Sequence, residues 1–456
     1  MKVLKFGGTS VGTVDSLRNV KSIVDSMPQP CIVVVSALGG LTDKLISTAQ
    51  MAMQGDENFK ENMDSMAKRH YEIVDQLVPE HKRQDVLDNI NPLLKELSNI
   101  FLGVSLLQDL SEKTLNRIVS FGERISSIIV ANILESAEHK NSFDFIKTEK
   151  LFNKNIGSRQ ITDALIVESF QLPLKNTVVV GGFISKDKDS EEITNLGRGG
   201  SDYTAALIAA ALDAELLEIW TDVNGFLTAD PRIIPDAKVI SDMTFIESME
   251  LCSFGAKVIY PPTIYPVFHK NIPIKILNTH NPSAPGTLIT DNSDGLPSQV
   301  RGISSIKNTA MVLVSGNLTA NASEIFSRSY NAMARNGINV SLAAQPNPDA
   351  IFSMAVSATD AKRAVDVLKE EFAPELQSGE ISEVRYEDGL AIIAVVRESI
   401  KQIKGLGARL TNTLHRDGIE VKAINDGASE TTIAIIVSES DTERALKLVH
   451  GAVYGS

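Results

Sequence analysis

Two glycine-rich segments of the chain carry charged side chains suited to binding anions. Lys5–Ser10 (KFGGTS) follows a short apolar run, and Leu196–Tyr203 (LGRGGSDY) places Arg198 among three glycines. Amides of glycine turns can approach a phosphate closely, and a lysine or guanidinium beside them adds positive charge. Neither segment is a GxxxxGK[ST] or GxGxxG loop, so neither predicts a dinucleotide fold. By itself, each segment is also consistent with an ordinary turn, the second one followed by a helix that Ser201 or Asp202 caps.

Further short segments contain polar groups at turns. They are Ser36–Thr42 (SALGGLT), Phe121–Glu123 (FGE), Thr221–Gly225 (TDVNG), Ala229–Arg232 (ADPR) and Phe254–Val258 (FGAKV), which carries Lys257. Taken singly, each of these is more often a turn than a site. The seven histidines have no spacing that suggests a catalytic pair, and with the two cysteines they have no zinc-ligand spacing. No histidine is therefore given a role.

The segments lie where predicted strands stop. Short apolar or β-branched runs predict strands over Val3–Phe6, Cys31–Val35, Asn176–Phe183 and Glu215–Thr221. Helical spacing is found over Asp15–Ser26, over most of Asp43–Leu134 and from about Asp202 to Leu212. This alternation predicts an α/β architecture in which helices cover a parallel sheet. Open sheets of this kind bind ligands at the ends of their strands.

Composition limits the class of protein. The 456 residues are 43 % hydrophobic and 22 % charged, which is typical of a soluble globular protein of two to four domains. The net charge is −13 and no basic run offsets it, so neither nucleic acid nor an anionic membrane surface is an expected partner. No apolar run approaches the ~18–20 residues of a membrane span, and the N-terminus lacks the apolar core of a signal peptide. Two cysteines make no disulfide framework, which favours a reducing cytoplasm.

The C-terminal part contains an internal duplication. Gly337–Val340 (GINV) matches Gly418–Val421 (GIEV), an offset of 81 residues (418 − 337 = 81) that further positions share without a gap. Each copy predicts a βαββα module. Asn281–Pro297 is rich in Pro, Ser, Asn and Gly and indicates a boundary before the repeat. We therefore predict domains over residues 1–297, 298–383 and 384–456.

Taken together, the motifs resemble the signature segments of aspartokinases. KFGGTSV, FGE, GRGGSDYTA, TDVNGFLTADPR and FGAKVIYP occur in the order of that family, and the repeat is similar to its paired ACT domains. The resemblance implies an amino-acid-kinase-like, open, mostly parallel sheet sandwiched by helices, followed by two ferredoxin-like βαββα modules. An end at Ser456 is expected to leave no room for the homoserine dehydrogenase half of bifunctional relatives.

The resemblance also implies an activity: Mg-ATP phosphorylates the β-carboxylate of L-aspartate, with ATP and Mg²⁺ as cofactors and no protein metal ligand assigned. Because a carboxylate with a pKa of about 3.9 is ionised at neutral pH, no general base is needed. For ATP, the resemblance implies that Lys5, Gly7 and Gly8 contact the β/γ-phosphates with Ser36 nearby, that Asp202 orients Lys5, that Thr221 and Asp222 contact the nucleoside, and that Arg232 and Lys257 contact the phosphates. For aspartate, it implies that Arg198 binds the α-carboxylate and Glu123 the α-ammonium. Thr42 and Ser201 would complete that pocket. Leu227 stands where the family often has a tyrosine near the adenine.

Regulation follows from the same resemblance. Paired ACT domains imply a homodimer or higher oligomer and feedback by lysine or threonine. Threonine-responsive members have a glutamine after the second strand of each module; this chain has Gln345 in the first copy and Asp426 in the second. Asp426 favours lysine or a silent second site, and a module that serves dimerisation alone is the alternative. Two other functions stay open: another amino-acid kinase of the same fold, or a non-catalytic ACT sensor of amino acids.

Overall fold

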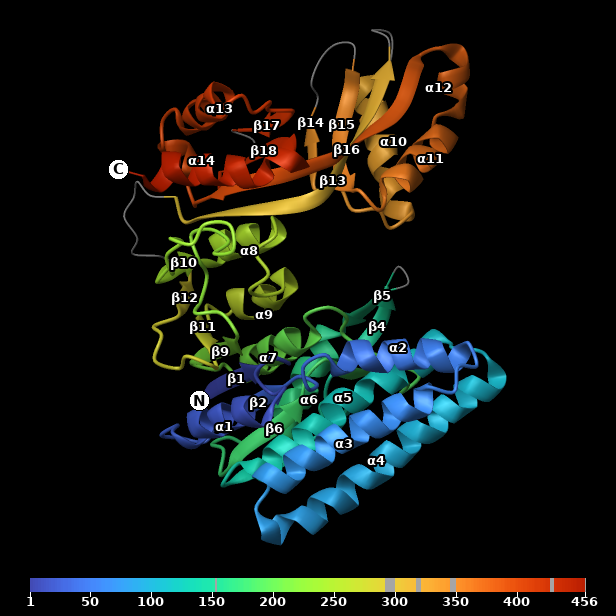
Figure 1. Ribbon diagram of the computed structural model, residues 1–456, viewed down its shortest axis with the longest axis vertical. Coiled ribbons are helices and arrows are strands. Elements are labelled where there is room, and N and C mark those ends of the chain that lie inside the picture. The colour runs from blue at the N-terminus through green and yellow to red at the C-terminus, as the bar shows by residue number, and fades with distance from the viewer. Residues whose placement is uncertain (152–153, 292–299, 317–320, 345–349, 427–429, 456) are drawn as a thin grey trace. The chain divides into compact units, whose positions relative to one another are not determined.

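The chain forms two compact units in the computed structural model, which describes residues 1–151, 154–291, 300–316, 321–344, 350–426 and 430–455 (Figure 1). The first unit contains Met1–Phe226, Val239–Phe245 and Lys257–Asp294, and the second contains Leu227–Lys238, Ile246–Ala256 and Gly295–Ser456. The predicted boundary after residue 297 lies outside the described residues. The predicted boundary after residue 383 falls within one continuous strand, so the predicted domain limits stay predictions.

An eight-stranded sheet forms the centre of the first unit. Its order is β10-β12-β11-β9-β1-β2-β6-β3, and only the β11–β12 pair is antiparallel. The strands are β1 (Lys2–Phe6), β2 (Ile32–Val35), β3 (Ala137–Lys140), β6 (Thr177–Gly181), β9 (Leu216–Thr221), β10 (Asp242–Thr244), β11 (Ile274–Asn278) and β12 (Thr287–Thr290). The buried IVVV run of β2 has a parallel neighbour on each side, as the sequence predicts. The mostly parallel sheet is thereby confirmed.

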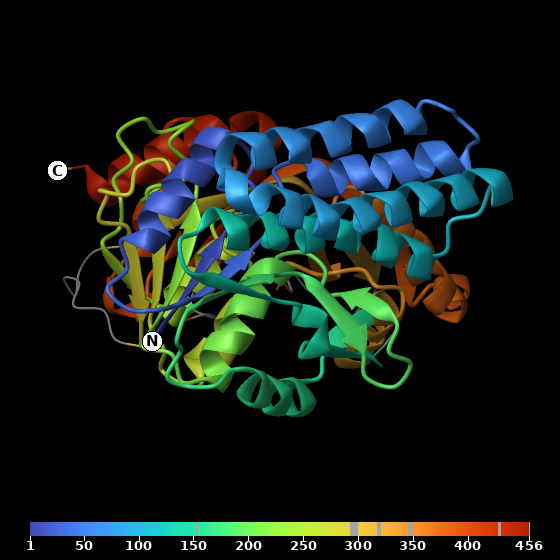
Figure 2. The same ribbon diagram turned by 90° about the horizontal axis from the view of Figure 1, so that it is seen from below.

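Helices cover both faces of this sheet. The helices of the unit are α1 (Val14–Asp25), α2 (Leu41–Met53), α3 (Phe59–Leu77), α4 (Glu80–Leu107), α5 (Glu112–Ile133), α6 (Arg159–Ser169), α7 (Gly200–Ala211) and α9 (Ile264–Phe268). Leu4 and Phe6 of β1 pack into one core with α1–α5, so the helical layer predicted over Asp43–Leu134 is confirmed (Figure 2). Alternate side chains of a strand point to opposite faces. Lys5 therefore points to the other face, where α7 packs on β1 and β9.

A small second sheet, which the sequence did not predict, lies between α5 and α7 in the chain. It has the order β5-β4-β7-β8 and is built from β4 (Lys147–Leu151), β5 (Lys154–Gly157), β7 (Ile184–Asp187) and β8 (Ile193–Asn195). Its strands are short and polar, so they give no apolar run. β8 leads directly into the glycine-rich segment before α7.

The second unit is a single six-stranded antiparallel sheet with helices. The strand order is β14-β15-β13-β16-β18-β17. The elements are β13 (Gly302–Gly316), α10 (Ala322–Arg335), β14 (Leu342–Ala344), β15 (Ala350–Ser357), α11 (Ala361–Glu371), α12 (Ala373–Ser378), β16 (Ile381–Val396), α13 (Leu406–Arg416), β17 (Ala423–Asn425), β18 (Thr432–Ser438) and α14 (Thr442–Tyr454). Helix α8 (Phe245–Ser253) also lies largely in this unit.

The duplication is visible in the order of these elements. β17 begins at residue 423 and β14 at residue 342, which is the offset found in the sequence. The two βαββα copies share one sheet because β13 and β16, the first strand of each copy, pair with each other within the chain. The outermost strands of the sheet are β14 and β17. Across the described ranges, the structure contains no helix long and apolar enough to cross a membrane.

Candidate active site at the ends of the parallel strands

Two glycine loops, one after β1 that contains Gly7 and Gly8 and one after β2 that runs from Ser36 to Gly40, meet where these strands end. The Gly7 amide donates to the Trp220 carbonyl of β9 (3.1 Å), and the Ser36 amide donates to the Phe6 carbonyl (3.2 Å). Beyond these bonds the loops pack backbone against backbone: a Cβ added to Gly39 would lie 3.0 Å from the Gly8 carbonyl oxygen. Glycine is needed here because no side chain fits between the loops. The predicted phosphate-binding residues Gly7 and Gly8 thus lie next to the loop that begins with Ser36.

Lys5 and Asp202 form a buried ion pair on the α7 face of the sheet. Each residue is only 9 % exposed, and Lys5 Nζ contacts Asp202 Oδ1. Helix α7 begins at Gly200 after Gly199, which has a left-handed backbone (φ +69°) and is the N-cap. The prediction that Ser201 or Asp202 caps this helix is therefore wrong. Since a glycine makes the turn, both side chains lie in the first helical turn, and Asp202 reaches the lysine.

Glu123 places a carboxylate in the interior beside these loops. The residue lies on α5 and is 4 % exposed; its carboxylate accepts a hydrogen bond from the Ala37 amide, while Oε2 has no hydrogen-bond partner among the described residues. Burial raises its pKa to about 8, because desolvation disfavours the charged form more than the hydrogen bonds stabilise it. An unpartnered buried carboxylate oxygen is costly and fits a cationic ligand group.

Close backbone contacts join Glu123 to the start of α7. A Cβ on Gly181, at the end of β6, would lie 2.9 Å from the Glu123 carbonyl oxygen, and one on Gly182 would lie 2.6 Å from Ser201 Cα. Ser201 is buried and precedes Asp202. The structure thus brings together Lys5, Gly7, Gly8, Ser36, Glu123, Ser201 and Asp202 at one edge of the sheet.

Two predicted ligands of aspartate lie at the ends of neighbouring elements. Arg198 is exposed in the loop between β8 and α7, and within the described ranges its guanidinium has no ion pair. Thr42 is half-buried in the first turn of α2, whose N-cap is Gly40. Their contacts with substrate stay predictions.

The end of β9 is held by a polar network that reaches the first glycine loop. Thr221 Oγ1 donates to the exposed carboxylate of Asp222 (3.2 Å), and the Thr279 amide donates to the Thr221 carbonyl (2.9 Å). Thr279 Oγ1 in turn lies 2.7 Å from Ser10 Oγ. The predicted nucleoside-binding residues Thr221 and Asp222 are therefore tied to the loop that carries Gly7.

The remaining predicted residues are placed differently. Arg232 belongs to the second unit, where its exposed guanidinium pairs with Asp230 (2.7 Å), and this partner lowers the pKa of Asp230. Leu227 belongs to the same unit. Lys257 is exposed in the first unit, outside any helix or strand. Gln345 lies outside the described residues. The roles of these four residues stay predictions.

The sequence did not single out two residues that shape the loops. A Cβ on Gly199 would lie 2.3 Å from Tyr260 Cβ, so the glycine-rich turn before α7 rests on Tyr260. Arg69 of α3 donates to carbonyls of both glycine loops. Tyr260 falls within the FGAKVIYP motif, which could have indicated it. Arg69 lies in the middle of a helix with no local signal.

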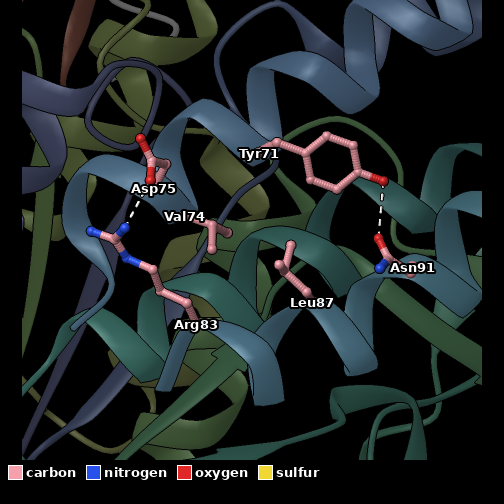
Figure 3. A pocket seen from close by; sticks show the side chains of 6 residues that line it. All are labelled: Tyr71, Val74, Asp75, Arg83, Leu87 and Asn91. Carbon is pink, nitrogen blue, oxygen red and sulfur yellow. Dashed lines mark hydrogen bonds and ion pairs between the residues drawn. The ribbon is translucent and has the colours of Figure 1, made fainter. Parts of the chain in front are cut away.

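A hollow of about 360 Å³ lies elsewhere, between α3 and α4 (Figure 3). Its polar groups pair with one another: Tyr71 Oη donates to Asn91 Oδ1 (2.9 Å) and Arg83 Nη1 to Asp75 Oδ1 (2.8 Å). Apolar side chains of Val74 and Leu87 form the rest of the lining. This hollow offers no unpaired charged group to a ligand. Across the described part of the chain, there is also no cluster of three or more His, Cys, Asp or Glu side chains that could hold a metal ion.

A comparison with family models identifies the class of protein. Residues 1–278 match the model of the amino acid kinase family, and residues 393–453 match an ACT domain. The chain therefore belongs to the amino acid kinase family.

Relatives within that family are aspartokinases. The chain is 32 % identical to the bifunctional aspartokinase/homoserine dehydrogenase of Haemophilus influenzae, over 100 % of this chain but 57 % of that protein, and it spans about half the length of several such relatives. It is 28 % identical to the lysine-sensitive aspartokinase 3 of Escherichia coli, over 99 % of each chain. Its fold matches the crystal structure of E. coli aspartokinase III in complex with aspartate and ADP (TM-score 0.85, 27 % identity, 100 % of both chains). It also matches the aspartate kinase of Clostridium acetobutylicum (TM-score 0.81, 25 % identity, 99 % of this chain and 100 % of that one).

Proposed function

We propose that the chain is an aspartate kinase that transfers the γ-phosphoryl group of Mg-ATP to the β-carboxylate of L-aspartate. The product is 4-phospho-L-aspartate, from which lysine, threonine and methionine are made. The observation that carries the proposal is the buried carboxylate of Glu123, with one oxygen unpartnered, at the same sheet edge as the Lys5–Asp202 pair. It is supported by full-length similarity to aspartokinases, one of which was crystallised with aspartate and ADP.

The α-ammonium and the α-carboxylate of aspartate are each bound by a side chain of opposite charge. The α-ammonium pairs with Glu123, whose charged form a bound cation favours. Arg198 supplies a planar guanidinium for the α-carboxylate. An N-acylated amino acid or a nucleotide lacks the ammonium, so Glu123 would be left buried without a partner. This argues against N-acylated amino acids and nucleotides as substrates, whereas free glutamate has the same ammonium and is separated from aspartate by the test below.

Phosphoryl transfer then rests on position and charge. The attacking β-carboxylate is ionised at neutral pH and needs no base. The obstacle is repulsion between this anion and the triphosphate, which Lys5 and the glycine-loop amides reduce because they carry positive charge at fixed positions. Asp202 holds Lys5 in place. Magnesium enters with the nucleotide, and Mg²⁺ of this kind is bound largely by phosphate oxygens and water.

Regulation and assembly complete the proposal. The ACT modules bind lysine or threonine and join copies of the chain into a homodimer or larger oligomer. The E. coli relative is lysine-sensitive, and its structure with lysine and aspartate matches this fold (TM-score 0.77). The content of only two cysteines, Cys31 and Cys252, accords with a cytoplasmic location.

The test is a substrate comparison with a chemical trap. ADP release is measured with L-aspartate, L-glutamate, N-acetylglutamate and UMP side by side, and hydroxylamine is added to trap an aspartyl hydroxamate. We expect ADP and hydroxamate with aspartate alone. ADP formation with glutamate but not aspartate would show another amino-acid kinase, and no turnover with any substrate would favour a sensor.

A further inference from the structure

Arg69 joins the two glycine loops of the site. Its guanidinium donates from Nη1 to the Gly39 carbonyl (2.9 Å) and from Nη2 to the Gly12 carbonyl (2.6 Å). Gly12 ends the loop that contains Gly7 and Gly8, and Gly39 lies in the loop between Ser36 and Thr42. One planar group thus bridges two segments that are far apart from α3 in the sequence.

Between the two loops, the backbones touch directly with no side chain from the contacting glycines. Gly8, Gly12 and Gly39 meet through bare backbone: a Cβ on Gly12 would lie 3.0 Å from the Gly8 carbonyl oxygen and 3.4 Å from the Gly39 nitrogen. Glycine permits this approach but also leaves the chain free to adopt other conformations. A rigid fork with two parallel N–H donors can fix such a pair of carbonyls, whereas a lysine ammonium is a single point.

Holding a carbonyl also sets the direction of an amide. In a trans peptide the C=O and the following N–H point in opposite directions. Because the Gly39 carbonyl turns toward Arg69, the Gly40 amide turns away from it. Gly40, whose backbone is left-handed (φ +75°), is the N-cap of α2 and lies two residues before Thr42. The Arg69 guanidinium thereby orients the Gly40 N–H, which is a hydrogen-bond donor at the positive, N-terminal end of α2.

The guanidinium lies half-buried, and burial lowers its pKa from the usual arginine value. An arginine side chain is not deprotonated in proteins, so the guanidinium stays charged at neutral pH. Within the described ranges it forms no ion pair with a carboxylate, and both of its bonds go to the loop carbonyls. Its charge therefore acts on the loops rather than on a salt-bridge network.

We propose that Arg69 is a positioning residue for phosphoryl transfer, which fixes the distance between the loop of Gly7 and Gly8 and the loop of Ser36 and Thr42. The inference rests on the proposed function in one respect: it takes the first loop to contact ATP and the second to lie by the aspartate pocket. Without the Arg69 guanidinium, the two loops lose their fixed position relative to each other. A misplacement of about 1 Å can lower a rate by as much as roughly 100-fold.

The experiment compares Arg69→Ala and Arg69→Lys with Arg83→Ala. Arg83 is a matched control because it also donates to a backbone carbonyl, that of Val78 (3.0 Å), and lies by the hollow between α3 and α4 (Figure 3). Steady-state kinetics, the Kd of Mg-ATP by calorimetry and the melting temperature are measured for each. Methylguanidine is then added at about 10 mM to fill the space of the missing guanidinium.

We expect Arg69→Ala to lower kcat/KM for both substrates by about 10- to 100-fold, and Arg69→Lys to lower it less. Methylguanidine should restore part of the loss in Arg69→Ala and change nothing in Arg83→Ala. Unchanged kinetics in Arg69→Ala, or a loss that follows the melting temperature and is not rescued, would overturn the proposal. If the wild type fails to phosphorylate aspartate, the proposed function is wrong, but a weakened and rescuable Kd for Mg-ATP would still support the role of Arg69.

Discussion

A buried carboxylate beside the parallel sheet of the first unit and one in the second unit are partnered differently. In the parallel sheet of the first unit, strands end at one edge and leave polar groups there incompletely satisfied, as Glu123 Oε2 shows. In the antiparallel sheet of the second unit, β16 is buried continuously from Leu390 to Val396. A buried carboxylate in that unit, Glu247, has partners: it pairs with Arg301 (3.3 Å) and accepts from the Glu398 amide (2.9 Å).

The difference has a physical reason. Parallel strands bring all their carboxyl ends to the same edge, where loops must turn and amides stay available for a ligand. Antiparallel strands alternate in direction and are joined along their length, so the duplicated modules bury their first strands against each other. Substitutions at the parallel edge should therefore change activity more than stability. Substitutions in the duplicated sheet should change regulation and leave the uninhibited rate unchanged.

The largest effect is expected from Lys5→Ala. Losing the charge that we propose to face the transferred phosphate should lower kcat by about 10²- to 10³-fold, by analogy with the removal of one donor to a developing charge. It also leaves Asp202 buried without its partner, which should lower the free energy of unfolding by roughly 3–5 kcal/mol. Kinetics and urea unfolding measure the two effects.

A double variant separates these effects. Lys5→Met with Asp202→Asn removes both charges, so stability should return while activity stays low. If the double variant regains activity, Lys5 serves only to neutralise Asp202.

Arg198→Lys should weaken aspartate far more than ATP. A point ammonium does not reproduce a planar fork to a carboxylate. The loss of about 1.5–3 kcal/mol corresponds to a roughly 10- to 150-fold rise in the aspartate KM. KM values for both substrates provide the measurement, and a raised KM for ATP alone would place Arg198 on the nucleotide.

The regulatory modules should respond differently. We expect lysine or threonine to inhibit the wild type by roughly 5- to 150-fold, the range of a typical coupling between sites, and Gln345→Ala to abolish this inhibition with kcat unchanged. Asp426→Ala is the matched control in the second copy. A Cβ on Gly407 of α13 would lie 1.9 Å from Asp426 Oδ2, so that carboxylate already occupies the space beside the helix.

Titrations of both variants with lysine, threonine and the two together measure this asymmetry. Inhibition that persists in Gln345→Ala and disappears in Asp426→Ala would move the effector site to the second copy. No inhibition of the wild type would leave the repeat a structural module.

The smallest effect concerns pH. Burial raises the pKa of Glu123 to about 8, so the carboxylate is mostly neutral in the empty site at pH 7. Since only its charged form attracts an ammonium, kcat/KM for aspartate should rise by about fivefold between pH 7 and pH 8 and level off near pH 9 at about tenfold its value at pH 7. Glu123→Gln should flatten this profile.

Stability should follow the opposite trend. A raised pKa means that the folded protein binds the proton more tightly than the unfolded chain, so the contribution of Glu123 is complete below the unfolded value of 4.5 and is lost as pH rises through about 8. As pH increases, the free energy of unfolding of the wild type should therefore fall relative to that of Glu123→Gln, as unfolding curves of both proteins would show. A constant difference across this range would contradict the raised pKa.

Much of the fold could be predicted because its signals are local. The apolar runs of β1, β2, β6 and β9 and the helical spacing of α2–α5 depend on neighbouring residues alone. The repeat could be found because its offset is constant. The short sheet of β4, β5, β7 and β8 was missed because its strands are polar, and the capping of α7 was misjudged because Gly199 makes the turn that a side chain was expected to make.

By itself, the sequence predicted which segments could carry chemistry, from the residue types and the order of the motifs along the chain. It indicated Lys5, Glu123 and Asp202 separately, on segments more than 70 residues apart. Only the tertiary structure decided that the Lys5–Asp202 pair, which the resemblance implied, is buried, that one oxygen of Glu123 is left without a partner among the described residues, and that Arg69 bridges two loops. Pairing, burial and the pKa of a carboxyl depend on neighbours that the fold supplies, and a one-dimensional pattern does not contain those neighbours.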